Sequence, residues 1–250
     1  MQTLLRKIFI AIAPANTMLR TRLADGVIVM GRNKPGYGGR GIFVDGDDIE
    51  PEVQQLHRFL TPDSVLIDVG ANTGVYSLKA AKLLSGKGEV LSVEPNLDML
   101  ESLSAAVKAN RFRNIRLRNV CASDKLGHAD FWCNDGKPNS FSLVRHDPNA
   151  DRMSVLTVPL DNLVEWEGLH RVDYLKLDVE GAEDIVLAGA AKTIAKFRPI
   201  VQYEVTIREV KADFPDYRGF RAGESSNVVY FPRESSYINV ARELGWSALT

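Results

Sequence analysis

The chain has 250 residues, of which 45% are hydrophobic and 25% are charged, and its formal net charge is −1. These proportions are ordinary for a globular protein with a substantial core, and the charge balance excludes a general electrostatic affinity for nucleic acid. The 2 cysteines are too few for a disulfide framework, so we expect a reducing, cytoplasmic location.

Residues 1–48 are interpreted as an N-terminal extension packed on the main domain. Residues 1–20 look helical, and the apolar run Ile8–Ala13 inside them is too short to span a membrane. Two short strands are expected further along, separated by a glycine-rich loop, at residues 27–30 and 41–44. Basic residues dominate up to residue 40 and acidic residues follow. We interpret this pattern as a solvated surface in preference to a contact with an anionic partner.

Residues 49–250 are expected to form one α/β domain. A first helix is predicted over residues 49–60, and strands then alternate with helices. The strands are predicted at residues 65–69, 90–93, 115–120, 173–179 and 200–205, and the helices between them at residues 74–84, 97–110 and 183–196. Because these strands are apolar on both faces, they predict a Rossmann-like fold, with a mostly parallel sheet and helices on both faces.

Two departures from this alternation are expected. Extra strands lengthen the third connection, at residues 129–133 and 155–158. Near the C-terminus, residues 227–231 predict a strand and residues 238–245 a short helix, so we expect an antiparallel C-terminal edge strand. The polar stretch before them, residues 206–227, is either a lid over a site or a plain surface loop.

The stretch VLIDVGANTGVYSL, residues 65–78, carries the strongest functional signal. Gly70 and Gly74 follow a predicted strand, at the place where a doubly wound sheet binds its ligand. The pattern matches neither of the two common phosphate motifs. A Walker turn requires lysine directly after its last glycine, where this chain has Val75. A dinucleotide turn requires a middle glycine, where this chain has Asn72.

Two acidic residues indicate which ligand the turn accepts. Asp68 precedes the turn and would repel a pyrophosphate, since two unit charges about 4 Å apart interact by roughly 4 kcal/mol in an intermediate dielectric. The turn therefore favours a ligand with positive charge, such as S-adenosylmethionine. Glu94 ends the second strand, where an acid binds a ribose diol. Pro95 and Asn96 then start the next helix, with Asn96 as a possible cap.

Five segments extend the pattern between residues 50 and 232: DVGANTG, VEPN, NVCASDKLG, YLKLDVEGAE and RPIVQYEV. In this order they resemble the FkbM family of S-adenosylmethionine-dependent methyltransferases. The resemblance implies a class I methyltransferase fold, S-adenosylmethionine as cofactor, and O-methylation of a macrolide, a sugar or a related metabolite. It also implies cofactor-binding residues: Asp68, Gly70, Ala71, Asn72 and Gly74 in the turn, Glu94, Pro95 and Asn96 after the second strand, Cys121 and Ala122 beside the adenine, and Asp178, Val179 and Glu180 beside the methyl group.

Asp178 and Glu204 are the candidate catalytic residues. Each ends an apolar strand at the edge of the sheet that binds ligands. Two acids at adjacent strand ends can deprotonate or orient a substrate hydroxyl, or they can hold a divalent metal. We assign them to the hydroxyl and assign no metal. Class I enzymes that methylate amino groups typically have an Asn/Asp-Pro-Pro-aromatic motif after the fourth strand. This motif is absent here, which favours an oxygen acceptor.

We therefore expect an S-adenosylmethionine-dependent O-methyltransferase acting on a small molecule or glycan, without a nucleic-acid partner and without a membrane span. Two alternatives stay open. An NAD-dependent oxidoreductase would share the turn and Glu94 but would bring a pyrophosphate beside Asp68. A non-catalytic nucleoside-binding module would keep the sheet without the chemistry. The acceptor would be shaped by residues 30–45 and 206–227.

Overall fold

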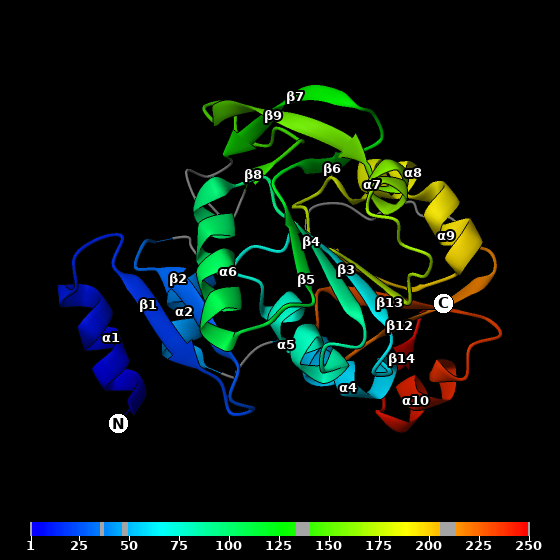
Figure 1. Ribbon diagram of the computed structural model, residues 1–250, viewed down its shortest axis with the longest axis horizontal. Coiled ribbons are helices and arrows are strands. Elements are labelled where there is room, and N and C mark those ends of the chain that lie inside the picture. Colours follow the sequence, from blue (N-terminus) through cyan, green and yellow to red (C-terminus); the bar gives the residue numbers. More distant parts are fainter. Residues whose placement is uncertain (1, 36–37, 47–49, 134–140, 206–213, 250) are drawn as a thin grey trace.

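The computed structural model describes residues 2–35, 38–46, 50–133, 141–205 and 214–249, and Figure 1 shows their arrangement. The described residues form three sheets, of eight, four and two strands. The large sheet runs through the centre of the molecule. The four-stranded sheet lies beyond one end of its strands, and the two-stranded sheet lies at one side with the N-terminal helix (Figure 1).

The large sheet contains the five strands that the apolar runs predicted. They are β3 (Val65–Val69), β4 (Glu89–Val93), β5 (Ile115–Arg118), β10 (Tyr174–Leu177) and β11 (Ile200–Glu204). All five are parallel, in the order β11-β10-β3-β4-β5, which confirms the predicted fold class. The chain leaves β3 first toward β4 and later returns on the other side with β10. The carboxyl ends of β3 and β10 therefore flank a topological switch point, where such sheets bind ligands.

The C-terminal edge of this sheet is wider than predicted. It consists of β12 (Tyr217–Arg221), β13 (Asn227–Pro232) and β14 (Ser247–Ala248). The predicted antiparallel strand is β13, which pairs with β11. It is not the edge strand, because β12 and β14 extend the sheet beyond it. The polar composition of residues 206–227 concealed β12. The first part of that stretch, residues 206–213, lies outside the described residues, so its interpretation as a lid stays a prediction.

Helices cover both faces of the large sheet. They are α3 (Pro51–Gln54), α4 (Leu56–Phe59), α5 (Val75–Leu84), α6 (Leu97–Asn110), α7 (Leu160–Trp166), α8 (Glu183–Gly189), α9 (Ala191–Phe197) and α10 (Tyr237–Glu243). Successive residues of β3 point to opposite faces: Leu66 packs in one core cluster with Phe59, and Ile67 packs in another with Val186. This two-sided burial explains why the strands are apolar throughout.

Two predicted helices are each divided into two in the structure. The expected helix over residues 49–60 is divided at Gln55 into α3 and α4, and the one over residues 183–196 is divided at Ala190 into α8 and α9. In the second case Gly189 lies against the backbone of Ser123, a contact that no local pattern indicates. The helix over residues 97–110 is confirmed, and its cap is Asn96, whose side chain accepts a 3.0 Å hydrogen bond from the Asp98 amide.

The two extra strands predicted in the third connection belong to a separate sheet. It has the order β6-β9-β7-β8 and consists of β6 (Cys121–Ser123), β7 (Gly127–Cys133), β8 (Phe141–Ser142) and β9 (Asp151–Pro159). This sheet stands above the carboxyl ends of the parallel strands (Figure 1). It is anchored there because the Ser142 hydroxyl donates a 3.2 Å hydrogen bond to the Val179 carbonyl, directly after β10.

The N-terminal extension contains α1 (Gln2–Ile12), β1 (Met18–Arg22), β2 (Ile28–Arg32) and α2 (Gly38–Asp45). The helix predicted over residues 1–20 is wrong beyond Ile12, since the alternation MLRTR forms a strand in which Leu19 is buried and Arg20 exposed. The strand predicted at residues 41–44 is also wrong, because this segment is helical. Its first turn packs closely on β2, where Gly39 meets Gly31 backbone to backbone. The division at residue 48 stays a prediction.

Candidate active site

A cavity of about 230 Å³ lies at the carboxyl ends of β3, β4, β10 and β11, beneath the four-stranded sheet. Most of the residues predicted to form the site line it: Gly70, Asn72, Glu94, Pro95, Cys121, Ala122, Asp178, Val179, Glu180 and Glu204. Four predicted residues do not line it: Asp68, Ala71, Gly74 and Asn96. The sequence analysis missed the remaining lining residues: Val69, Val93, Met99, Phe131, Phe141, Leu143 and Ala182.

The glycine turn follows β3 and presses against the end of β10. Gly70 has a φ of 74°, and a side-chain carbon there would collide with the carbonyl oxygen of Asp178. Its amide donates a 3.0 Å hydrogen bond to the Val93 carbonyl, so the turn is also joined to β4. Gly74 has a φ of 80° and lies against Leu103 of α6. Glycine is therefore required at both positions for the turn to fit between its neighbours.

Replacing Gly70 by alanine is expected to lower the free energy of unfolding by at least about 2 kcal/mol, since the positive φ and the collision with Asp178 both carry a cost. The same change should weaken binding of S-adenosylhomocysteine, because the turn must move away from β10. The matched control is Gly86→Ala. Gly86 has a φ of 79°, but its added carbon meets open space. Equal losses in urea denaturation of the two variants would show that the close approach to Asp178 is unimportant.

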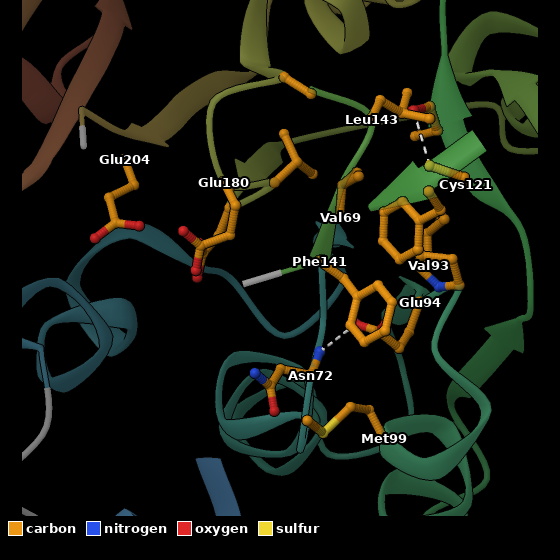
Figure 2. Close-up of a pocket in the computed structure, with 17 residues that line it drawn as sticks. Val69, Asn72, Val93, Glu94, Met99, Cys121, Phe141, Leu143, Glu180 and Glu204 are labelled. Atoms are coloured by element: carbon orange, nitrogen blue, oxygen red, sulfur yellow. Dashed lines mark hydrogen bonds between the residues drawn. The ribbon is translucent and has the colours of Figure 1, made fainter. Parts of the chain in front are cut away.

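Glu94 connects the turn to the start of α6. One carboxylate oxygen accepts a 2.8 Å hydrogen bond from the Asn72 amide (Figure 2), and the other accepts one of 2.8 Å from the Asn96 amide. Its side chain is buried, and burial raises the pKa of Glu94 to about 7. Asn72 has a φ of 52°, a left-handed conformation that asparagine tolerates. Glu94 thus holds the turn in shape while its carboxylate still lines the cavity.

Asp68 lies away from the cavity, whereas it was predicted to contact the ligand. It is fully buried, and its carboxylate accepts hydrogen bonds from the Ser77 amide (3.1 Å) and the Ser77 hydroxyl (2.6 Å). Its other oxygen lies 3.5 Å from the ammonium of Lys176. The predicted contact of Asp68 with a cationic ligand is not supported by this placement, because the positive charge beside it is a lysine of the chain.

Lys176 is a buried cation beside the site, in contact with residues of the turn and of the acidic strand end. Its ammonium lies 3.5 Å from Asp68, 3.2 Å from Asp178 and 3.5 Å from the Gly70 carbonyl oxygen, and 5.0 Å from the centre of the Tyr76 ring. Burial lowers the pKa of Lys176, but the carboxylates of Asp178 and Asp68 outweigh it and the net shift is upward. The sequence analysis missed this residue, although a lysine inside an apolar strand was a signal that an acidic partner had to exist.

Three carboxyl groups gather at the other end of the cavity. Oxygens of Asp178, Glu180 and Glu204 all lie within 4.8 Å of one another, and all three side chains are half-buried. Burial and the neighbouring carboxyl of Asp178 raise the pKa of Glu204 to about 8. Among the described residues, no lysine or arginine lies within 4.0 Å of Glu204, whereas Asp178 has Lys176. A proton is therefore held on Glu204 near neutral pH.

Glu180 occupies an unusual backbone conformation within this group. Its φ of 55° lies in the left-handed region, which side chains other than those of glycine, asparagine and aspartate rarely adopt. The following residue, Gly181, also has a positive φ of 90°. Strained backbone of this kind is retained where the surrounding structure requires it, and it is frequent at functional sites. The turn after β10 carries the Glu180 carboxyl into the cavity (Figure 2).

Aromatic and aliphatic side chains form the wall on the side of Glu94. Phe131 and Phe141 stack with ring centres 5.2 Å apart, and Leu143 and Met99 also line the cavity. This wall offers a flat apolar surface of the kind that accepts a nucleobase. Cys121 lies beside it, and burial raises the pKa of its thiol to about 12, so the group is a neutral wall residue rather than a nucleophile.

Two sequence comparisons both match this chain to methyltransferases. The sequence profile of the methyltransferase FkbM domain matches residues 68–224, more than half of the chain. The chain is 25% identical over 194 residues to the 2-O-methyltransferase NoeI of Sinorhizobium fredii, a match that covers 70% of this chain and 77% of that protein.

Solved structures resemble this one in fold. The crystal structure of a methyltransferase FkbM from Methylobacillus flagellatus KT gives a TM-score of 0.50 at 17% identity, over 69% of this chain. The match covers 44% of that longer chain. A tRNA (uracil-54, C5)-methyltransferase from Pyrococcus abyssi in complex with S-adenosyl-L-homocysteine gives a TM-score of 0.48 at 14% identity, over 85% of this chain and 44% of that chain.

Proposed function

The chain belongs to the methyltransferase FkbM family, whose methyl donor is S-adenosylmethionine, and we propose that it transfers the methyl group to a hydroxyl oxygen of a small molecule or glycan. The observation that carries the proposal is the division of the cavity into two ends. One end has Glu94 and the aromatic wall, and the other has Asp178 and Glu204 on adjacent parallel strands (Figure 2).

The residues of the first end fit a nucleoside. Glu94 presents a carboxylate that can accept hydrogen bonds from ribose hydroxyls, and Phe131 and Phe141 provide the flat surface for the adenine. The turn from Gly70 to Asn72 lies nearest the amino-acid part of the cofactor in this assignment. The alternative of an NAD-dependent oxidoreductase and that of a non-catalytic module find no support in the comparisons.

The residues of the second end fit the acceptor. When bound, S-adenosylmethionine supplies an electrophilic methyl carbon on a positively charged sulfur. Asp178 and Glu204 would orient the acceptor hydroxyl, and the ionised carboxylate of one of them would take its proton as the methyl group is transferred. Lys176 keeps the Asp178 carboxylate in place.

The charge of the second end indicates the class of acceptor. Carboxyl groups accept hydrogen bonds from neighbouring hydroxyls, as a sugar presents them, whereas they repel phosphates. Nucleic-acid sites are instead lined by lysine and arginine. The name of the relative NoeI, a 2-O-methyltransferase, agrees with an oxygen acceptor. We therefore favour an uncharged polyol or glycan over RNA, and a cytoplasmic location, which the two free cysteines favour.

The acceptor can be identified directly. The protein is incubated with S-adenosylmethionine carrying a labelled methyl group and with separate pools of glycans, small molecules and RNA from the source organism. Mass spectrometry then locates the label. We expect a methyl ether on a hydroxyl-bearing product. Label on a base of RNA, or on nitrogen or carbon of any product, would contradict the proposal.

Replacing Glu94 by glutamine is expected to weaken S-adenosylhomocysteine binding about tenfold or more, measured by isothermal titration calorimetry. The amide has one acceptor oxygen where the carboxylate has two, so one hydrogen bond, to Asn72 or to Asn96, is lost together with the charged contact to ribose. The matched control is Glu89→Gln at the opposite end of the same strand, where the carboxylate pairs with Arg116. Equal affinities of the two variants would remove Glu94 from the cofactor site.

A further inference from the structure

The N-terminal helix α1 carries its apolar face on the outside of the molecule. The side chains of Leu4, Leu5, Ile8 and Ile12 are 63%, 60%, 49% and 76% exposed. Residues four apart lie on one face of a helix, so Leu4, Ile8 and Ile12 form a continuous stripe with Leu5 beside it. Phe9 of the same helix is 44% exposed, and the remaining large exposed hydrophobic side chains among the described residues are scattered over several elements, as is normal for single residues.

Other residues of α1 attach it to the rest of the molecule. Phe9 packs on Phe43 of α2 with ring centres 5.6 Å apart, and the Arg6 guanidinium lies 5.7 Å from the centre of the same ring. The Asn33 side chain donates hydrogen bonds to the carbonyls of Ile10 (3.0 Å) and Ala13 (3.1 Å). These contacts fix the rotation of the helix. Its apolar stripe is therefore presented outward, the reverse of an ordinary surface helix.

Exposed basic residues lie in the same part of the chain as this stripe. Residues 2–24, which include α1 and β1, contain no aspartate or glutamate. Lys7, Arg20 and Arg22 are exposed, and none of the three forms an ion pair with another described residue. In Figure 1, α1 and β1 lie at the same end of the molecule, away from the four-stranded sheet, and both contact α2. An apolar stripe with unpaired cations beside it is complementary to a surface that is both apolar and anionic.

We propose that α1 binds flat on an anionic lipid membrane, with Leu4, Ile8 and Ile12 entering the boundary between headgroups and acyl chains and the exposed cations contacting lipid phosphates. Among the described residues, no helix has the length and apolar character needed to cross a membrane, which is consistent with attachment to one surface. A second copy of the chain is a poorer occupant. Two-fold pairing of α1 would bring Lys7 of both copies together without an acid on either helix to compensate.

The test is binding of the full chain to lipid vesicles in a flotation assay. We expect binding to vesicles of phosphatidylcholine with phosphatidylserine, weaker binding to phosphatidylcholine alone, and loss of binding as the salt concentration rises. Ile8→Glu should weaken binding to the anionic vesicles about tenfold or more, because it puts a charge in the middle of the stripe. Arg20→Gln with Arg22→Gln should weaken binding to anionic vesicles selectively.

The matched control is Leu126→Glu, which makes the same kind of change at another exposed side chain, 59% accessible, between β6 and β7. It should bind vesicles like the unaltered chain, and all variants should bind S-adenosylhomocysteine equally. Absence of vesicle binding by the full chain would overturn the proposal, as would equal losses for Ile8→Glu and Leu126→Glu. A dimer that Ile8→Glu dissociates, without any vesicle binding, would assign the stripe to a second copy and also overturn it.

Discussion

Replacing Glu204 by glutamine is expected to lower kcat for methyl transfer by about 10²-fold or more, while the affinity for S-adenosylhomocysteine stays within about threefold. Glutamine keeps the shape of the side chain and cannot accept the hydroxyl proton. Asp178→Asn should have the same signature, because its carboxylate lies in the same group of acids. Single-turnover kinetics with the identified acceptor measures the chemical step. Unchanged turnover in either variant would remove that residue from the mechanism.

The pH dependence gives a second readout of the same residue. The folded-state pKa of Glu204 is raised to about 8, so the carboxylate that we propose as a base becomes available as pH rises through that value. The rate of the unaltered enzyme should therefore rise between about pH 7 and pH 9 and then level, with the apparent pKa belonging to Glu204 and Asp178 together. The matched control is Glu224→Gln, an exposed carboxyl in the turn before β13, which should leave both rate and profile unchanged.

The raised pKa also predicts a change in stability. A carboxyl whose folded-state pKa lies above its ordinary value of 4.5 contributes stability that is fully present below that value and is lost as pH rises through the folded pKa. For Glu204 the window runs from about pH 4.5 to about pH 8. In thermal melting, the stability of Glu204→Gln should fall less across this window than that of the unaltered protein. A parallel fall in the variant and the unaltered protein would mean that Glu204 is not buried as described.

Replacing Lys176 by methionine is expected to lower the free energy of unfolding by about 3–5 kcal/mol, measured by urea denaturation. Methionine fills a similar volume, but Asp68 and Asp178 lose the buried ammonium that lies 3.5 Å and 3.2 Å from them. Methyl transfer should fall as well, since Asp178 would no longer be held by its cation. The control is Lys79→Met, whose ammonium pairs with Asp25 near the surface, where an ion pair contributes about 1 kcal/mol or less.

A double-mutant cycle distinguishes a specific pairing from a general packing effect. Asp68→Asn removes one of the charges that Lys176 compensates, so Lys176→Met should cost less in the Asp68→Asn background than in the unaltered protein. We expect an interaction free energy of about 1–3 kcal/mol between the two positions. Additive losses would contradict the role of Lys176 as the counterion of Asp68. The amount of ordered structure, followed by circular dichroism, checks that each variant folds.

Elements with a strong local pattern were predicted well. β3 was predicted with its observed bounds, Val65–Val69, and so was α6, Leu97–Asn110. Both lie in segments where burial on two faces, or a cap with a periodic helix, is visible within a few residues. Besides the strands missed at the C-terminal edge and the two divided helices, the errors lie in the N-terminal extension. Residues 41–44 form part of a helix and not a strand, because the packing of α2 on β2 through two facing glycines outweighs the local preference.

The residues of the candidate site also differ in whether a local pattern could predict them. Residues in the turns after β3 and β4 were found because glycines and acids at strand ends are a local pattern. Phe131, Phe141 and Leu143 were missed because the first two belong to a separate sheet, and Leu143 directly follows it, and this sheet reaches the cavity only when the chain is folded. Lys176 was missed for a related reason. Its partners are Asp68, far earlier in the chain, and Asp178, and no spacing in the sequence brings all three together.

Local patterns in the sequence were enough to predict the parallel sheet, the turn at Gly70 and the acids at the strand ends, because apolar runs, glycines and charges act over a few neighbouring residues. How those charges are used depends on the tertiary structure. It paired Asp68 with Lys176 in the core, left Glu204 without a described cation so that burial raises its pKa, and rotated α1 so that its apolar stripe faces outward. Such outcomes depend on contacts between segments far apart in the chain, and a local pattern contains no information about them.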